Sequence, residues 1–180
     1  AEQLHDRRVK AQFDMEKIEE TLGRQLADSQ YSRANVKNEL QGKRSQTRIS
    51  KALKGVQYRS QEAQTAEKIQ DLRMEGMANQ GRLMARGQSG NSIAKAANSI
   101  TNMVGMKQSR LLDGLTRFES QYKLGVMQDS QTLANFETSS QINLNKLDTT
   151  DAYNNYAADR GRRSLDETIK SAERSFNSQN

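Results

Sequence analysis

The sequence contains no proline in any of its 180 positions. Proline is the residue that most strongly ends or kinks a helix, so nothing in the chain forbids long uninterrupted helices. The one strong interruption is the loop Ala85–Ser92, in which Gly87 acts as a helix stop and Gly90 lies within the turn. Asn91 or Ser92 can then cap the next helix. The sequence therefore predicts two long helical arms joined by a turn at mid-chain.

The composition argues against a compact globule. Hydrophobic residues make up 33% of the chain and aromatic residues 5%, and the mean hydropathy is −0.97. Disorder is the usual consequence of such values, but disordered chains normally contain proline and lack periodicity. We therefore expect thin helices that bury narrow apolar stripes against each other or against other subunits.

Apolar residues recur at helical spacing along both arms. In the first arm the stripe is formed by Leu4, Ala11, Met15, Ile18, Leu22 and Leu26, and it resumes as Ile49, Leu53, Val56, Ala63, Ala66 and Ile69. In the second arm it is formed by Val104, Leu111, Leu115, Phe118 and Tyr122. This spacing is typical of the buried seam between packed helices.

Two further interruptions are predicted near the end of the chain. They are Asp148–Asp151 and Asp159–Gly161, and Ser164–Glu167 has the pattern of a capping box that begins a final helix. The predicted fold is all-α, an elongated helical hairpin of two long helices with a short C-terminal helix. Its predicted parts are a first arm at 1–86, a turn at 87–92, a second arm at 93–148, and a linker with the short helix at 149–180.

The chain lacks the residues that most catalytic and metal sites need. It has no cysteine and a single histidine, His5, so a thiolate site, a His-based zinc site or a Ser-His-Asp triad within one chain is excluded. No apolar run approaches the roughly 20 residues that span a bilayer. We expect a non-enzymatic protein with no catalytic residues, no metal site and no cofactor.

The strongest charge asymmetry lies between Arg33 and Arg59, where eight basic residues accompany one acid, Glu39. At 100° per residue, one helix face collects five of them, namely Arg33, Lys37, Arg44, Arg48 and Lys51. Such a basic stripe can contact a phosphate backbone, anionic lipid or an acidic partner. The alternative interpretation is a solvated face that only keeps the helix soluble.

Methionines gather on both sides of the predicted turn. Five of the seven lie there, Met74, Met77, Met84, Met103 and Met106. Methionine is flexible and polarizable, so this apolar tip can form a deformable surface for another subunit or a membrane. The alternative is that these methionines fill the core of the hairpin.

The turn and its flanks carry a family resemblance. The stretch Gly81–Ser92, followed by Ile93 and by Arg117–Tyr122 in the second arm, resembles the internal virion proteins of short-tailed podovirus phages, and most closely the smallest core protein. The family has a Gln- and Ala-rich first helix, a Gly-x-x-Gly-Asn-Ser turn and a second long helix. The resemblance covers roughly residues 41–141. The apolar N-terminal segment of that family has no counterpart in this sequence.

The resemblance implies a structural protein in the capsid core above the portal. Its implied partners are copies of itself in a ring, the portal and other internal core proteins, with nonspecific contact to DNA. After ejection it would lie in the host cell envelope and help to form a conduit for DNA across the outer membrane. Two other classes are compatible with the sequence, a secreted helical filament or translocon component and a nonspecific nucleic-acid-binding helical scaffold.

Overall fold

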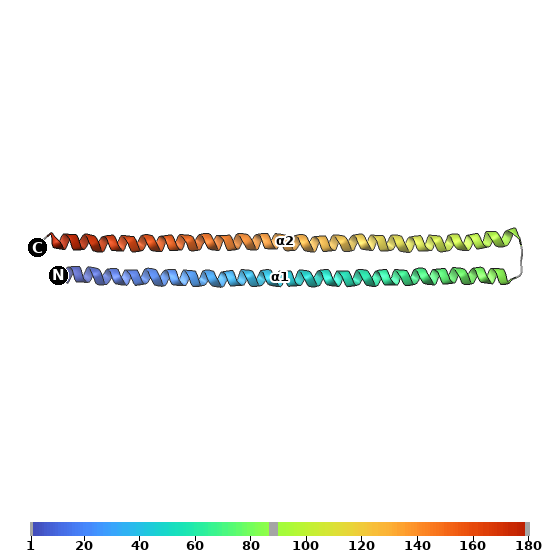
Figure 1. The fold of residues 1–180 in the computed structure, drawn as a ribbon, viewed down its shortest axis with the longest axis horizontal. Coiled ribbons are helices and arrows are strands. Elements are labelled where there is room, and N and C mark those ends of the chain that lie inside the picture. The colour runs from blue at the N-terminus through green and yellow to red at the C-terminus, as the bar shows by residue number, and fades with distance from the viewer. Residues whose placement is uncertain (1, 87–89, 179–180) are drawn as a thin grey trace. The chain divides into compact units, whose positions relative to one another are not determined.

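The computed structural model describes residues 2–86 and 90–178, and within these ranges the chain forms two helices and no strand. Helix α1 is Glu2–Ala85 and helix α2 is Asn91–Asn177 (Figure 1). The prediction of an all-α helical hairpin with two long helices is confirmed.

The turn is shorter than predicted on its C-terminal side. Helix α2 begins at Asn91, so Asn91 and Ser92 belong to its first turn. Gly90 has a φ of 134°, a backbone conformation that glycine adopts without the steric cost of a side chain. The Ile93 amide donates to the Gly90 carbonyl at 3.2 Å. Gly87 lies outside the described residues.

The predicted short C-terminal helix is wrong, because α2 continues through residues 149–177 without a break. At the first expected interruption, the hydroxyls of Thr149 and Thr150 donate to the carbonyls of Asn145 and Lys146, at 3.0 and 2.9 Å. These bonds to the preceding turn allow threonine to remain inside a helix. The run of short polar residues therefore does not end α2.

The second expected interruption is also helical. Gly161 is half-buried, and a Cβ added there would lie 2.9 Å from Ile18 Cδ1. Its lack of a side chain therefore serves close helix packing and not a turn. The Ser164 carbonyl accepts a hydrogen bond from Thr168 Oγ1 at 2.8 Å, so the expected capping box lies in mid-helix.

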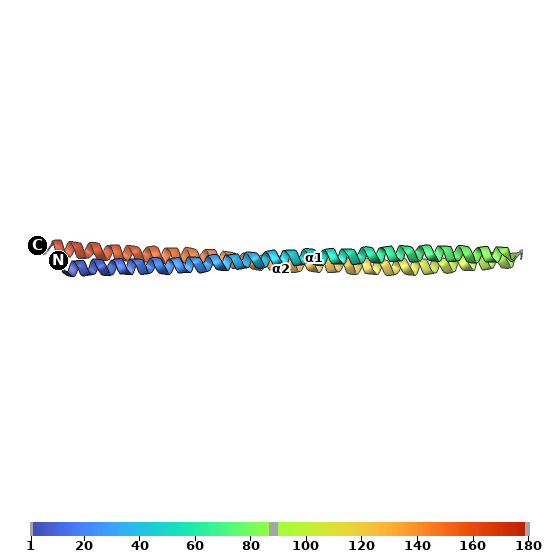
Figure 2. The same ribbon diagram turned by 90° about the horizontal axis from the view of Figure 1, so that it is seen from below.

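The chain divides into two compact units. Unit 1 comprises Ala1–Lys43 and Ala134–Asn180, and unit 2 comprises Arg44–Leu133. Within each unit, one segment of α1 lies beside one segment of α2 that runs in the opposite direction, as two views of the ribbon agree (Figures 1 and 2). Each unit is thus a pair of antiparallel helical segments.

In unit 1 the predicted apolar stripe is the packed face. Leu4, Met15, Ile18, Leu22 and Leu26 are half-buried, and Ala11 is buried. Small side chains occupy the other buried positions of this unit, namely Ser29, Ser140, Ala158 and Ala172. The prediction for this part of α1 is confirmed.

In unit 2 the predicted stripe of α1 is wrong except at its last member, Ile69, which is half-buried. Ile49, Leu53 and Val56 are 57%, 59% and 62% exposed, and Ala63 and Ala66 are exposed as well. The packed face of this segment carries instead Thr47, Ser50, Lys54, Tyr58 and Thr65. The reason lies in α2, which presents an aspartate and two aromatic rings here, and these take up a lysine and a tyrosine better than aliphatic side chains.

Candidate interaction surfaces

Arg33, the first residue of the predicted basic stripe, is turned toward α2 within unit 1. Its guanidinium forms ion pairs with Asp148 and Asp151. The Ser29 hydroxyl donates to Asp151 Oδ2 at 2.9 Å. We call Ser29, Arg33, Asp148 and Asp151 the Arg33 cluster. Only 26% of the Arg33 side chain is exposed, so this residue stabilises the helix pair and is poorly placed to contact a polyanion.

The Arg33 cluster shifts the titration of its own members. The hydrogen bonds to Asp148 and Asp151 raise the pKa of Arg33. The hydrogen bond from Arg33, and to a smaller extent the one from Ser29, lowers the pKa of the Asp151 carboxyl. Each bond stabilises the charged form of its group. Arg33 and Asp151 are therefore held in their charged forms.

A second polar cluster lies in unit 2 and was not anticipated. Lys54 Nζ contacts Asp129 Oδ2 at 2.7 Å and the Gly125 carbonyl at 3.1 Å. The Ser50 hydroxyl donates to Asp129 Oδ2 at 2.8 Å. We call Ser50, Lys54, Gly125 and Asp129 the Lys54 cluster. Hydrogen bonds from Lys54 and then from Ser50 lower the pKa of Asp129.

One signal in the sequence pointed to the Lys54 cluster. Asp129 lies at helical spacing within the apolar row Tyr122, Val126, Leu133 and Phe136. A charged residue in such a row is costly unless it has a partner on the facing helix. The sequence did not identify Lys54 as the partner of Asp129, since Lys54 is one of many basic residues in its segment.

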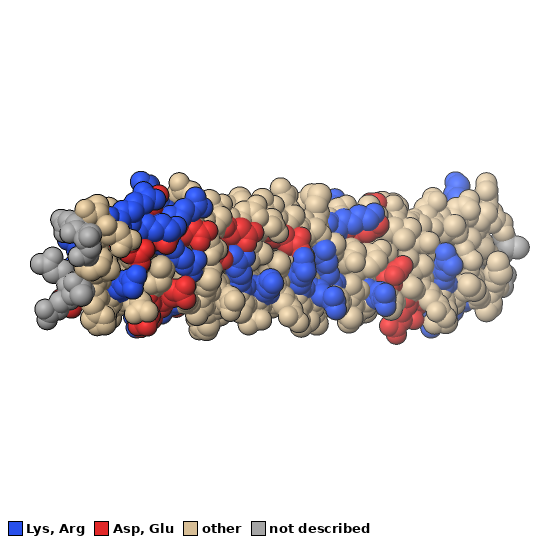
Figure 3. All heavy atoms as spheres, turned by 60° about the vertical axis from the view of Figure 1, so that its left-hand side comes forward, with Lys and Arg blue, Asp and Glu red and all other residues tan. Residues whose placement is uncertain are grey.

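The rest of the basic stripe is divided between the two units. Lys37, in unit 1, is exposed. In unit 2, Arg44 and Arg48 are exposed and Lys51 is half-buried. On the face shown in Figure 3, basic and acidic side chains are interspersed. Lys37 and Arg48 are thus the members best placed for a partner outside the chain.

Tyr58 forms an aromatic stack with α2 inside unit 2. Its ring lies 5.1 Å from that of Tyr122, at an interplanar angle of 17°, and 6.5 Å from that of Phe118, at 11°. Burial raises the pKa of the Tyr58 hydroxyl, and the nearby Glu119 raises it further. The second-arm stripe that includes Phe118 and Tyr122 was predicted, but its partner Tyr58 was not.

The methionines near the turn lie outside the core of unit 2. Their exposed fractions are 54% for Met74, 67% for Met77, 71% for Met84, 54% for Met103 and 60% for Met106. Half-buried side chains fill the space between the helices here, and they include Leu72, Leu83, Ile93, Ile100 and Val104. The interpretation of these methionines as hairpin core is therefore wrong.

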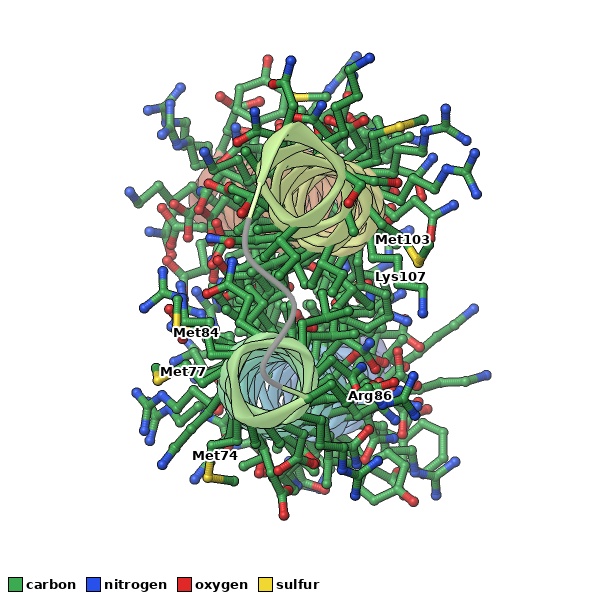
Figure 4. All side chains as sticks on the ribbon, turned by 90° about the vertical axis from the view of Figure 1, so that its right-hand side faces the viewer. Met74, Met77, Met84, Arg86, Met103 and Lys107 are labelled. Atoms are coloured by element: carbon green, nitrogen blue, oxygen red, sulfur yellow. The ribbon has the colours of Figure 1, made fainter. Side chains whose placement is uncertain are left out.

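The exposed methionines do not form one patch. Seen along the helices from the turn, Met77 and Met84 lie on one side of unit 2 and Met103 on the other (Figure 4). Met103 and Lys107 line an open groove of about 490 Å³ whose floor includes Gly76 and Val104. Met77 lines a smaller groove on the other side. The predicted apolar tip is thus split into separate exposed surfaces.

The described part of the chain contains no group of three or more His, Asp or Glu side chains that could hold a metal ion. Neither described helix has a stretch that is apolar enough to cross a membrane. Comparison of the chain with protein-family models, with curated proteins and with solved structures found no match.

Proposed function

We propose that this chain is a non-enzymatic structural subunit that acts in an assembly with copies of itself. The observation that carries this proposal is its surface of 13874 Å². A compact monomer of its mass, 20.3 kDa, would expose roughly 9000 Å². Among the described residues the buried apolar side chains are three alanines, Ala11, Ala158 and Ala172. Such a helix pair gains much of its stability from further packing against other subunits.

More narrowly, we propose an internal virion protein of a short-tailed phage, held in the capsid core near the portal with other core proteins. The resemblance in Gly81–Ser92 supports this assignment. In this stretch Gly90 has a positive φ and α2 starts directly at Asn91, as a Gly-x-x-Gly-Asn-Ser helix-to-helix turn requires. In this role the protein leaves through the tail ahead of the genome and helps to form a conduit across the host outer membrane.

The thin contact between the helices is compatible with passage through a tail. No side chain in the described residues is both large and fully buried. Opening the helix pair at any one level therefore exposes only side chains that are already partly in water, and such local opening requires less free energy than opening a fully buried core. A chain without proline or cysteine has no kink and no cross-link that would hinder it.

Two exposed basic residues, Lys37 and Arg48, supply the proposed contact with DNA or with an acidic neighbour. The same feature favours the second candidate function, a nonspecific nucleic-acid-binding scaffold. That function requires affinity for DNA to fall steeply with salt. A flat response between about 50 and about 200 mM salt would eliminate it.

The methionines that face sideways, Met77, Met84 and Met103, are the proposed membrane contact after ejection. Met103→Asp should abolish binding to anionic liposomes, because a carboxylate would have to leave water and approach like charge. The matched control is Asn102→Asp, which adds the same charge at the adjacent exposed position. Equal liposome binding by both variants would contradict the membrane role.

The decisive experiment is native mass spectrometry combined with electron microscopy of the full chain, alone and with anionic liposomes. Closed rings or membrane-embedded pores are the expected result. Open filaments would favour a secreted filament or translocon component instead. A monomer under all conditions would leave the nucleic-acid-binding scaffold.

A further inference from the structure

Unit 2 carries apolar side chains on the outer face of each of its helices. On α1, Val56 lies opposite the packed face, the exposed Ile49 and Leu53 lie beside it, and Met74 follows on the side of Val56 18 residues later. Eighteen residues are five full turns of an α-helix, so Val56 and Met74 lie on one side of α1. All four are more than half exposed. This outer face of α1 has no partner within the described chain.

The outer face of α2 shows the same arrangement. Leu124 is 50% exposed and Met127 58%, and Met106, which lies 18 residues and thus five full turns before Leu124, is 60% exposed. The half-buried residues Val104, Tyr122 and Val126 mark the opposite, packed side of the helix. Each helix of unit 2 therefore has an aliphatic site and a methionine site on its outer face, with equal separation.

The sites on the two helices are at the same levels. Tyr58 stacks on Tyr122, so Val56, two residues before Tyr58, is level with Leu124, two residues after Tyr122. Leu53 is five residues before Tyr58 and Met127 is five residues after Tyr122, so these two residues are also level.

The second pair of sites matches in the same way. Gly76 lies against Val104, and Met74 and Met106 are each two residues from this contact. We call Leu53, Val56, Leu124 and Met127 the aliphatic band, and Met74 and Met106 the methionine band.

We propose that copies of this chain pack side by side, with the outer face of α1 of one copy on the outer face of α2 of the next. Units 2 of neighbouring copies then point the same way, and both bands meet their counterparts without any shift in register. The contact is heterologous, so its repetition closes a ring or extends a filament. This inference deepens the proposed function, since it assigns the surface through which the assembly forms.

The residues between the two bands are compatible with the same pairing. Ser60 and Ala63 on the outer face of α1 are small, which permits close approach of another helix. Further along, Asp71 of α1 is within one residue of the level of Arg110 of α2, while Glu67 is level with Asp113, and Arg117 is level with Ala63; all these residues are exposed. None of these five charged residues forms an ion pair within the described ranges. Asp71 and Arg110 thus remain available to pair between neighbouring copies.

The available area is sufficient for such a contact. A stable interface takes about 800 Å² from each partner, and the proposed contact runs along both outer faces of unit 2, which includes Arg44–Leu133. A two-fold contact between two α1 faces could also pair Val56 with Met74, but it would leave Leu124, Met127 and Met106 uncovered. The heterologous contact covers every member of both bands.

Disulfide trapping tests this arrangement directly, because the natural chain has no cysteine. Val56→Cys and Leu124→Cys are introduced into separate full-length chains, which are mixed and oxidised. The same is done with Met74→Cys and Met106→Cys. The mismatched control combines Val56→Cys with Met106→Cys, on the same α2 face but at another level. Matched pairs should form disulfide dimers at least ~10-fold faster than the control, since docking raises the effective concentration of the thiols.

Each outcome decides the proposal. A chain with both Val56→Cys and Leu124→Cys should give a ladder of covalent multimers. Equal rates for matched and mismatched pairs, or no dimers, would overturn the contact, and a dominant dimer between Val56→Cys and Met74→Cys would replace it by the two-fold alternative. Rings without these cross-links would refute the contact and leave the proposed function intact. Filaments with them would keep the contact and refute the conduit.

Discussion

Gly76 and Val104 lie in close contact across the two helices of unit 2. A Cβ added to Gly76 would lie 2.9 Å from Val104 Cγ2, a separation that real Cβ contacts essentially never show. Valine in a helix is held almost entirely in one side-chain rotamer, so Val104 has little freedom to move aside. The backbone of α1 can therefore come this close to Val104 only because Gly76 has no side chain.

Gly76→Ala should lower the free energy of unfolding by about 1–3 kcal/mol, because the added methyl group overpacks the contact with Val104. The matched control is Gly81→Ala in the same helix, where nothing lies within 4 Å of an added Cβ. That substitution should stabilise by about 0.5–1 kcal/mol, as alanine usually does in a helix. Urea unfolding followed by circular dichroism measures both changes. Equal stabilisation by the two substitutions would show that the close approach does not exist.

Thermal stability should fall when the pH is lowered below about 4, the ordinary carboxyl pKa. The folded chain holds the pKa of Asp129 and of Asp151 below that value. Their stabilising contribution is therefore complete above the ordinary pKa and is lost as the pH falls through the lower, folded pKa. Asp129→Asn should lower Tm at neutral pH and flatten the acid decline. Asp113→Asn, on the exposed face of the same helix, should leave the Tm curve unchanged.

Arg33→Gln should lower thermal stability without changing the salt dependence of DNA binding, and Lys37→Gln should do the reverse. Loss of the Arg33 ion pairs leaves Asp151 without its cation, so Tm should fall, whereas Lys37→Gln should leave Tm unchanged. If the chain binds DNA, Lys37→Gln should reduce the slope of log affinity against log salt by about one. Arg33→Gln should not change that slope. Equal loss of DNA affinity in both variants would contradict the assignment of Arg33 to the helix pair.

Tyr58→Ala should destabilise unit 2 by about 1–3 kcal/mol, because it removes a half-buried ring and its stacking on Tyr122. Tyr31→Ala provides the comparison, since this tyrosine is 70% exposed and its loss should change stability by no more than about 0.5 kcal/mol. A spectrophotometric titration of Tyr58→Ala should also lose a tyrosine that titrates above the ordinary tyrosine pKa, because the pKa of Tyr58 is raised by burial. The same titration of Tyr31→Ala should retain it.

Much of the fold follows from local sequence features. The absence of proline and the single glycine-rich interruption were sufficient to predict two long helices and the place of the turn. The apolar spacing of Leu4–Leu26 identified the packed face of α1 in unit 1, since no residue there competes with it. The predicted interruption at Asp148–Asp151 failed, because short polar residues end a helix only when no tertiary contact or back-bonding holds them in it.

The packed face of α1 in unit 2 required knowledge of the facing helix. Ile49, Leu53 and Val56 form as regular a stripe as any in unit 1, yet Lys54 and Tyr58 face α2 in their place. The choice depends on Asp129 and Tyr122, which lie more than sixty residues away in sequence. Hydrophobic periodicity along one helix gives the faces that could pack, but not which of them does. For the same reason the sequence grouped Arg33 with the exposed basic residues.

The two polar clusters determine the register in which the helical segments of each unit pair. Apolar stripes tolerate a shift of one helical turn, since one aliphatic side chain replaces another at each level. The same shift would leave Asp151 without Arg33 and Asp129 without Lys54, and a half-buried charge without its partner is costly. Two helices that have been drawn apart will therefore close again in a single alignment, with no template needed to guide them.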